Sequence, residues 1–311
     1  MRIFYIANFK DIHSDKWVRF FEQEGHAVFR FHVNGFLSEL LRAKKEISTF
    51  KPQIVHIHYA GKNGLMGALT GFHPLIVTIH GSEVLLVKEW RRRFVRWVLK
   101  KADTITTDGN HVLDKITGPW KISADKVKRI NFGVDVDKFR RPEGFEVPVN
   151  VVAVRVGPDK LYDIETVEKA REIVDAKMPG IEWRFLDGIA PEDMPEALYS
   201  STVYVSAATS DAGLASTTAE AMSCEVPVIV TNVGDNARWV EESVNGFLFY
   251  PGDHQTLANR ILFTLRDGVI QRCYDERSRK IICDKNNYFA EMAKMKAIYK
   301  EVIDRGKETK S

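Results

Sequence analysis

Cysteine and long apolar segments are both scarce in this sequence, and each shortage narrows the class of protein. Only three cysteines occur in 311 residues, without the paired spacing of a metal site, so we expect reduced thiols and a cytoplasmic protein. No apolar run approaches the roughly 20 residues that a membrane-spanning helix needs. Met1 and Arg2 lead directly into a strand-like segment, which predicts that no signal peptide is present.

An excess of charge of one sign is also lacking. The 45 lysines and arginines nearly balance 42 acidic residues, and the formal charge of +3 is too small to indicate a nucleic-acid partner. Neither the Gly-x-Gly-x-x-Gly turn of dinucleotide sites nor the Gly-x-x-x-x-Gly-Lys-Ser/Thr loop of NTPases occurs, which disfavours both classes. With 44% hydrophobic and 28% charged residues, the composition is that of an ordinary globular protein.

Short β-rich runs alternate with helical patterns along the whole chain, which predicts an α/β protein with parallel sheets. A length of 311 residues suits two domains, each with its own core. The first series of strand-like runs is RIFYIA, HAVFRF, IVHIH, LIVTIH, TITT and VKRIN, and the second is VNVVAVRV, IEWRFL, TVYVSA, PVIVT and GFLFY. We therefore predict two doubly wound, Rossmann-like domains.

The join between the two series is predicted at residues 140–148, where Pro142, Gly144 and Pro148 interrupt both periodicities. The predicted domains are residues 1–146 and 147–287, followed by a C-terminal helix and tail over residues 288–311.

The segment SDAGLASTTAEAMSCEVPVIVTNVGDN places a polar turn, a short helix and a buried strand in succession. Ser210 and Asp211 are candidates to cap the helix, and its first turn, near Gly213 to Ser216, would offer backbone N–H groups to an anion. Glu220 follows within the helix, where a carboxylate can accept two hydrogen bonds from a ribose diol. A phosphate site beside a diol site predicts a nucleotide ligand.

The stretch EAMSCEVPVIVTNVGDN, followed by EESVNGFLFYPGD, resembles the nucleotide-sugar signature of the retaining glycosyltransferases of family four. Glu220 matches the second Glu of that family's Glu-x7-Glu motif. The first Glu is replaced by Ala212, one residue after Asp211. A variant branch of the family, with Asp-Ala-Gly before the helix and Gly-Asp-Asn after the strand, resembles this chain more closely.

The resemblance implies the GT-B fold, in which two Rossmann-like domains face a cleft and the C-terminal helix crosses back to the first domain. It implies a retaining, metal-independent transfer of a sugar from a UDP-, GDP- or ADP-sugar to a hydroxyl acceptor, with no further cofactor. The acceptor class stays open between a glycan, a lipid-linked molecule and a small molecule.

The resemblance also assigns residues. Arg155 and Lys160 have the spacing of the pair that binds the donor diphosphate, although two solvated surface cations are the alternative. His80, in PLIVTIHGSEV, corresponds to a histidine that borders the donor sugar. For Asp211, a sugar contact and a helix cap stay open as equal alternatives. The full predicted donor set is Asp211, Gly213, Leu214, Ser216, Thr217 and Glu220.

Acceptor candidates come from the first half of the chain: His13 in the loop after the first strand, and His58 with Tyr59 at the end of the third. Alternation in IVHIHY sends His56 and His58 to one face, where they could meet a metal. No third ligand is evident, so buried packing is favoured and no metal is predicted.

Residues 87–103 combine an apolar stripe of Val87, Trp90, Phe94, Trp97 and Val98 with several arginines and lysines. Such a helix could lie on anionic lipid, giving peripheral contact with the inner membrane face. A core helix with a solvated basic face is the favoured alternative.

Two rival functions stay open. One is a nucleotide-sugar epimerase or phosphorylase on the same fold, because a fold alone does not fix a reaction. The other is a non-catalytic nucleotide-binding protein, for which Ala212 is the argument.

Overall fold

The chain forms two compact units in the computed structural model. Unit 1 comprises Met1–Phe132 and Ala290–Ser311, and unit 2 comprises Gly133–Phe289. The structure describes residues 1–35, 37–157, 160–266 and 268–308, and of residues 268–276 only the backbone. The boundary predicted near Glu146 lies inside unit 2. The predicted domain ranges stay a prediction.

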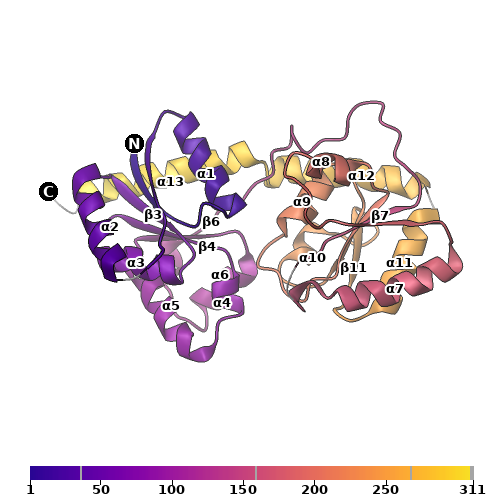
Figure 1. Ribbon diagram of the computed structural model, residues 1–311, viewed down its shortest axis with the longest axis horizontal. Helices are drawn as coiled ribbons and strands as arrows, with labels where there is room; N and C mark the ends of the chain where they lie inside the picture. Colours follow the sequence, from indigo (N-terminus) through magenta and orange to yellow (C-terminus); the bar gives the residue numbers. More distant parts are fainter. Residues whose placement is uncertain (36, 158–159, 267, 309–311) are drawn as a thin grey trace. The chain divides into compact units, whose positions relative to one another are not determined.

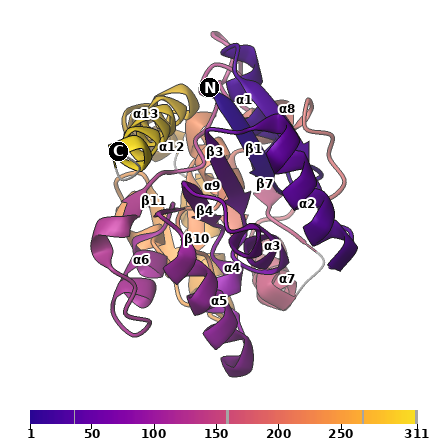
Figure 2. The same ribbon diagram turned by 90° about the vertical axis from the view of Figure 1, so that its left-hand side faces the viewer.

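Six parallel strands form the sheet of unit 1, in the order β2-β1-β3-β4-β5-β6. Ile3 of the strand β1 pairs with Val28 on one side and with Ile54 on the other. All residues of β3 and β4 are buried, as expected for central strands of a parallel sheet covered on both faces. The strands are β1 (Arg2–Ile6), β2 (Ala27–Phe31), β3 (Ile54–His58), β4 (Leu75–Ile79), β5 (Thr104–Thr107) and β6 (Val127–Arg129), and Figure 2 shows β1, β3 and β4 side by side.

Helices cover both faces of this sheet. On one face α2, α3 and α5 pack in sequence, while on the other α1 and α13 meet where the rings of Phe21 and Tyr299 stack 4.8 Å apart. In Figure 1, α1 and α13 lie above the strands of unit 1, and α3 and α5 lie below. The helices are α1 (Ile12–Gln23), α2 (Leu37–Phe50), α3 (Lys62–Thr70), α4 (Ser82–Leu85), α5 (Glu89–Lys101), α6 (Asn110–Thr117), the 3-10 turn η1 (Ala124–Lys126), and α13 (Tyr288–Glu308) from residue 290 onward.

Five parallel strands form the sheet of unit 2, in the order β11-β10-β9-β7-β8. The strands β7, β9 and β10 at its centre are buried throughout, and Ala153 pairs with Tyr204 across β7 and β9. The strands are β7 (Val151–Val154), β8 (Glu182–Phe185), β9 (Val203–Ser206), β10 (Val228–Thr231) and β11 (Gly246–Phe249).

Two apolar clusters flank the sheet of unit 2. Val167 of α7 and Ile261 of α11 belong to one cluster, and Met222 of α9 and Ile282 of α12 belong to the other. Cys224, in the second cluster, is fully buried, and burial raises the pKa of its thiol to about 12, so it is not a thiolate at neutral pH. The helices are η2 (Lys160–Tyr162), α7 (Ile164–Lys177), α8 (Met194–Tyr199), α9 (Ser216–Ser223), α10 (Asn236–Trp239), α11 (His254–Arg266) and α12 (Gly268–Lys285).

The predicted fold class is confirmed: each strand-like run of the sequence contains one strand of these two parallel sheets. Among the described helices, none has a stretch that is both long and apolar enough to cross a bilayer.

Candidate functional site

Each sheet reverses its strand order at one point, and polar side chains follow the strands on both sides of that point. The reversal lies between β1 and β3 in unit 1, and between β7 and β9 in unit 2. Ligands of open parallel sheets bind outside the carboxyl ends of the strands at such reversals. Each unit therefore has one edge position where the topology favours a binding site.

In unit 2 this position is occupied by a buried ion pair. Arg155 directly follows β7, and its Nη1 donates to both carboxylate oxygens of Asp211, each at 3.2 Å, and to Ser206 Oγ at 3.4 Å. The two side chains are 15% and 10% exposed. Burial opposes the charge of Arg155, but the Asp211 carboxylate together with the Tyr204 and Tyr162 hydroxyls outweighs it and raises the pKa of the guanidinium.

Of the two alternatives left open for Asp211, the structure excludes the cap of the motif helix. The helix α9 begins at Ser216 with Ala215 at its N-cap, and no side chain caps it. Asp211 instead contacts Arg155 and Asn236, while burial raises the pKa of its carboxyl. Gly234 lies so close that an added Cβ would be 2.2 Å from the Asp211 carbonyl oxygen. The Asp-Ala-Gly and Gly-Asp-Asn segments of the sequence are thus one packed unit.

The remaining predicted donor residues lie along the start of α9. Gly213 and Leu214 are buried in the turn before the helix, and Ser216 and Thr217 form its half-buried first turn. Glu220 lies one turn further on, also half-buried. The first N–H groups of a helix have no partner within it and carry the positive end of its dipole, so this turn suits an anion.

Lys160 is exposed in η2, at the end of the loop that follows Arg155. Tyr162 fixes this loop against the ion pair, because its ring lies 5.0 Å from the Arg155 guanidinium and an added Cβ on Gly157 would meet the ring at 2.1 Å. Pro158 and Asp159 of the same loop lie outside the described residues.

In unit 1 the strand ends bring together the histidines that the sequence singled out. His80 Nε2 lies 2.9 Å from His58 Nδ1, and its ring lies 6.1 Å from that of His13. Tyr59 stacks on His80 with ring centroids 3.8 Å apart. His58 is fully buried, whereas His13, Tyr59 and His80 are half-buried. All four predicted first-half residues therefore form one cluster.

Glu83 fixes the backbone beneath this cluster. Its Oε1 accepts the backbone N–H of His80 at 3.1 Å and that of Ala60 at 3.3 Å, and so joins the turns after β4 and β3. Burial raises the pKa of the carboxyl, and hydrogen bonds from the surrounding backbone oppose this shift. The sequence analysis missed Glu83, although it lies only three residues after His80.

A chain of buried hydrogen bonds continues from His58 into the interior of unit 1. His58 Nε2 lies 2.6 Å from the Tyr5 hydroxyl, which also contacts the Tyr299 hydroxyl of α13. Tyr299 in turn contacts His56 Nδ1, and His56 Nε2 lies 2.6 Å from Thr78 Oγ1. Both nitrogens of His56 are thus satisfied, in agreement with the packing role favoured from the sequence.

Burial keeps these histidines neutral. It lowers the pKa of His56 and His80 to about 3 and that of His13 to about 4, with neighbouring positive charge assisting, and it lowers that of His58 well below the usual value of a histidine. The Asp11 charge opposes the shift at His80 and His13 without reversing it. At neutral pH each ring therefore keeps one nitrogen with a free electron pair.

Comparisons with known families cover most of the chain. Residues 11–138 match the family described as Glycosyltransferase Family 4, and residues 148–281 match the family described as Glycosyl transferases group 1. Among curated protein sequences, none matches the chain.

Solved structures of the same architecture cover nearly its whole length. Sucrose-phosphate synthase from Thermosynechococcus elongatus superposes with a TM-score of 0.80 at 17% identity, covering 98% of this chain and 100% of that one. HepE from Anabaena, in complex with UDP, superposes with a TM-score of 0.76 at 16% identity, covering 97% of this chain and 100% of HepE. A glycosyltransferase from Rickettsia africae superposes with a TM-score of 0.77 at 15% identity, covering 97% of this chain and 98% of that one. These similarities establish the GT-B fold.

Proposed function

Because the chain is a glycosyltransferase whose two halves match the Family 4 and group 1 descriptions, we propose that it moves a sugar from a nucleoside-diphosphate sugar to a hydroxyl acceptor with retention of configuration. The observation that carries the proposal is the meeting of Arg155 with the Asp211 segment beside the start of α9, at the strand-order reversal of unit 2. HepE, a structural neighbour, has been solved with UDP-glucose, which supports a nucleotide-sugar donor here.

The donor residues have separate tasks in this proposal. Arg155, Lys160 and the first turn of α9 bind the diphosphate and stabilise its charge as the sugar departs. Glu220 accepts hydrogen bonds from the ribose hydroxyls. The backbone from Gly213 to Thr217 lines the phosphates. No metal is required in this scheme, because two cations and a helix terminus supply the positive charge.

Asp211 governs whether Arg155 is available to the donor. The guanidinium is held by the carboxylate through Nη1. A guanidinium has five N–H donors in a planar fork, so Arg155 can keep this contact and still donate to a phosphate from its other nitrogens. We therefore assign Asp211 to orienting Arg155, and a direct sugar contact by Asp211 becomes secondary.

The unit 1 residues receive their tasks from the family resemblance. His80 is assigned to the donor sugar, and His13, His58 and Tyr59 to the acceptor region. No enzymatic base is assigned, because the departing phosphate can take the acceptor proton in retaining enzymes of this kind. Among the acceptor candidates the half-buried Tyr59 is better placed for a direct contact than the fully buried His58, which can only act through its neighbours.

A nucleotide titration tests the donor site. UDP, GDP and ADP are titrated by calorimetry against the wild type, Glu220→Ala and Glu196→Ala, a matched control at an exposed position of α8. We expect one nucleotide to bind, at least tenfold weaker binding to Glu220→Ala, and unchanged binding to the control, since a lost charge-assisted hydrogen bond costs about 1.5–3 kcal/mol. Saturating concentrations of all three nucleotides without any heat would overturn the donor-site proposal.

The reaction itself is tested with the conjugates of the nucleotide that binds. Transfer to a sugar acceptor with the anomeric configuration kept, read by NMR of the product linkage, supports the proposal. Turnover without acceptor would indicate an epimerase instead, and tight binding without turnover of any conjugate would indicate a non-catalytic protein.

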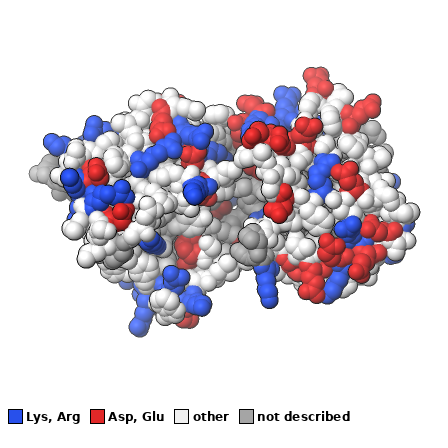
Figure 3. All heavy atoms as spheres, in the orientation of Figure 1, with Lys and Arg blue, Asp and Glu red and all other residues white. Residues whose placement is uncertain are grey.

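Peripheral membrane contact is a further part of the proposal, and it rests on the outer face of α5. Val95, Val98 and Leu99 form the buried face of this helix, whereas Trp90 is 73% and Trp97 37% exposed. The predicted apolar stripe is therefore divided, with its tryptophans outside the core. The exposed cations of the same helix are Arg91, Arg93, Lys100 and Lys101, and Figure 3 shows Lys and Arg side chains projecting from the lower part of unit 1, where α5 lies.

Tryptophans beside cations are the side chains that bind the interface of an anionic membrane. Vesicles of neutral and of 30% anionic phospholipid test this, with Trp90→Ala, Arg93→Glu and the charge-matched control Lys44→Glu on the exposed part of α2. Because each cation near such a surface contributes about 1 kcal/mol, Arg93→Glu should weaken sedimentation with anionic vesicles at least fivefold, while the control should not. Equal binding of all variants, or none by the wild type, would remove this part of the proposal.

A further inference from the structure

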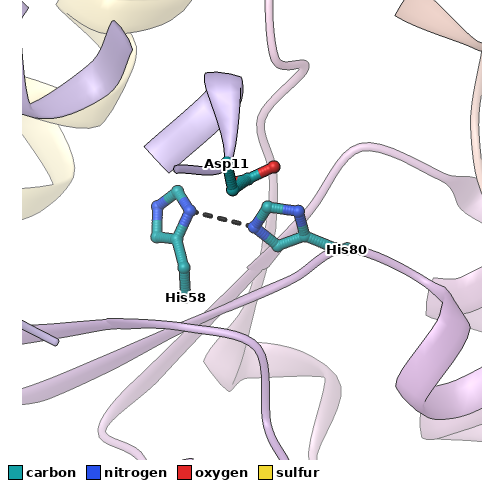
Figure 4. A group of neighbouring side chains, drawn as sticks. All are labelled: Asp11, His58 and His80. Atoms are coloured by element: carbon teal, nitrogen blue, oxygen red, sulfur yellow. Dashed lines mark hydrogen bonds between the residues drawn. The ribbon is translucent and has the colours of Figure 1, made fainter. Parts of the chain in front are cut away.

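Three side chains at the strand-order reversal of unit 1 converge in a way that the transfer reaction does not explain. Asp11 lies in the loop after β1, His58 ends β3 and His80 follows β4. One nitrogen of each ring and one carboxylate oxygen all lie within 4.8 Å of one another. Figure 4 shows the Asp11 carboxylate beside the two facing imidazole rings.

The two rings face each other nitrogen to nitrogen. His80 Nε2 and His58 Nδ1 are 2.9 Å apart, so at most one of them carries a proton in this arrangement. Since His58 is fully buried and His80 half-buried, both rings are held in the neutral form that metal ions bind. The third group, Asp11, supplies a negative oxygen.

Neighbouring groups hold all three side chains in orientation. The ring of Tyr59 stacks on that of His80 with centroids 3.8 Å apart. The Tyr5 hydroxyl, 2.6 Å from His58 Nε2, can accept that N–H and so leave an electron pair on Nδ1. His58 Nδ1 lies 2.9 Å from His80 Nε2 and 3.1 Å from the Ser14 hydroxyl, so a bound ion would replace the Ser14 contact. Asp11 caps α1, with its Oδ2 accepting the backbone N–H of Ser14 at 3.0 Å and the Ser14 hydroxyl at 2.6 Å. Such outer contacts fix ligands in metal sites and raise their affinity.

We propose that Asp11, His58 and His80 form a binding site for a divalent transition-metal ion, with zinc as the best match to two imidazoles and one carboxylate. Zinc–nitrogen bonds of about 2.0–2.1 Å at a tetrahedral angle place two nitrogens roughly 3.3 Å apart. The observed 2.9 Å then needs only a small outward rotation of His80. Three protein ligands leave a fourth position open, and the partial exposure of Asp11 and His80 gives the ion a path of entry.

The ion is inferred to oppose transfer rather than to drive it. Metal binding would use the Nε2 electron pair of His80, the residue assigned to the donor sugar, so occupied protein should be inhibited. This consequence for activity depends on the proposed function, whereas the binding itself does not.

Direct metal binding provides the test. Metal-free full-length protein competes with a chromogenic chelator for Zn²⁺ at pH 7.5, and Co²⁺ is added separately to record its visible absorption. His73→Ala is the matched control, because His73 also lies 2.7 Å from a carboxylate, Asp103, but on the surface. Asp11→Asn and His80→Ala remove half-buried ligands and avoid the fully buried His58. Binding of the nucleotide that the calorimetric titration identifies is measured in parallel on every variant.

We expect one Zn²⁺ per wild-type chain, the intense Co²⁺ bands of a four-coordinate site, at least tenfold weaker Zn²⁺ binding to Asp11→Asn and to His80→Ala, and no change in His73→Ala. Unchanged binding to either ligand variant would overturn the proposal, as would a wild type that does not compete with the chelator. Because the nucleotide is assigned to unit 2, loss of metal binding with nucleotide binding intact is distinguishable from failure of the donor-site proposal.

Discussion

Arg155 and Asp211 form an ion pair at the carboxyl edge of the unit 2 sheet, with Nη1 of the arginine 3.2 Å from both oxygens of the aspartate. The two residues are far apart in the sequence and follow two adjacent strands, β7 and β9. The pair therefore joins the loop predicted to bind the diphosphate to the segment that precedes α9.

Asp211→Ala should lower the free energy of unfolding by about 3 kcal/mol, because it leaves the Arg155 charge buried and uncompensated. The double variant Arg155→Ala/Asp211→Ala should lose less than the sum of the single losses. Urea denaturation of the single variants and the double variant measures these losses in the free energy of unfolding. The control is Glu165→Ala, which removes the exposed pair with Lys169 and should change stability far less than Asp211→Ala, because water screens an exposed pair. Additive losses at Arg155 and Asp211 would contradict a functional ion pair.

Gly234→Ala should be more disruptive than the same change at another glycine with positive φ. Gly234 has φ +55°, and its added Cβ would lie 2.2 Å from the Asp211 carbonyl oxygen, whereas Gly188 has φ +64° with open space around it. Both variants incur backbone strain of about 1 kcal/mol, but only Gly234→Ala must displace backbone. We expect a clearly lower melting temperature and weaker nucleotide binding for Gly234→Ala alone. Equal effects would show that strain, and not the close approach, sets the requirement for glycine.

Stability should fall steeply as the pH drops below 6.5. The depressed pKa of His80, about 3, means that the unfolded chain takes up a proton near pH 6.5 while the folded protein does not. The contribution of His80 to the free energy of unfolding is therefore fully present above pH 6.5. Below pH 6.5 it decreases by about 1.4 kcal/mol per pH unit, until the folded ring also protonates. His56 and His13 add slopes of the same sign.

Urea denaturation of the wild type and His80→Gln at pH 7, 6 and 5 measures this slope. The variant should show a pH dependence smaller by about 1.4 kcal/mol per unit between pH 6 and pH 5, because glutamine does not titrate. Parallel curves would mean that His80 is protonated in the folded protein.

Glu83→Gln should retain the fold, whereas Glu83→Ala should lose about 1–3 kcal/mol, because only the alanine leaves the N–H groups of Ala60 and His80 unpaired. The pKa of Glu83 is raised by burial, so its carboxyl destabilises the protein as the pH rises through that pKa. Glu83→Gln should accordingly gain stability relative to the wild type from pH 5 to pH 8. Thermal melts of the variant and the wild type at pH 5 and pH 8 measure this gain. A variant that becomes less stable relative to the wild type at pH 8 would contradict a raised pKa of Glu83.

The fold was predictable from the sequence because parallel strands are buried on both faces and read as short apolar runs. IVHIH and VVAV show this pattern, and β3 and β7 lie there. The position of Arg155 at a strand end was predictable for the same reason. Local patterns carry no information on contacts between distant segments, so a helix cap and a sugar contact stayed open for Asp211, whereas its partners in the structure are Arg155 and Asn236.

The grouping of Asp11 with His58 and His80 was not predicted for a related reason, although both histidines were singled out from the sequence. His56 and His58 share a face of one strand by alternation, which suggested that they act together. In the structure the neighbours of His58 are set by the sheet instead. The loop after β1, the end of β3 and the turn after β4 lie at one edge of the sheet, so His58 lies beside Asp11 and His80. The order of strands in the sheet, which the sequence does not contain, determines this grouping.

The packing of α13 also constrains when the chain can fold. Met292, Met295 and Tyr299 of this helix are fully buried in unit 1, and Tyr299 closes the hydrogen-bonded chain through His56. All the segments of unit 2 are translated before these residues. During synthesis the first six strands must therefore wait, with the part of one sheet face that α13 covers still exposed beside α1, while unit 2 can complete its own core. The half of the protein that is made first is the half that finishes folding last, and a ribosome stalled near residue 289 would hold it incomplete.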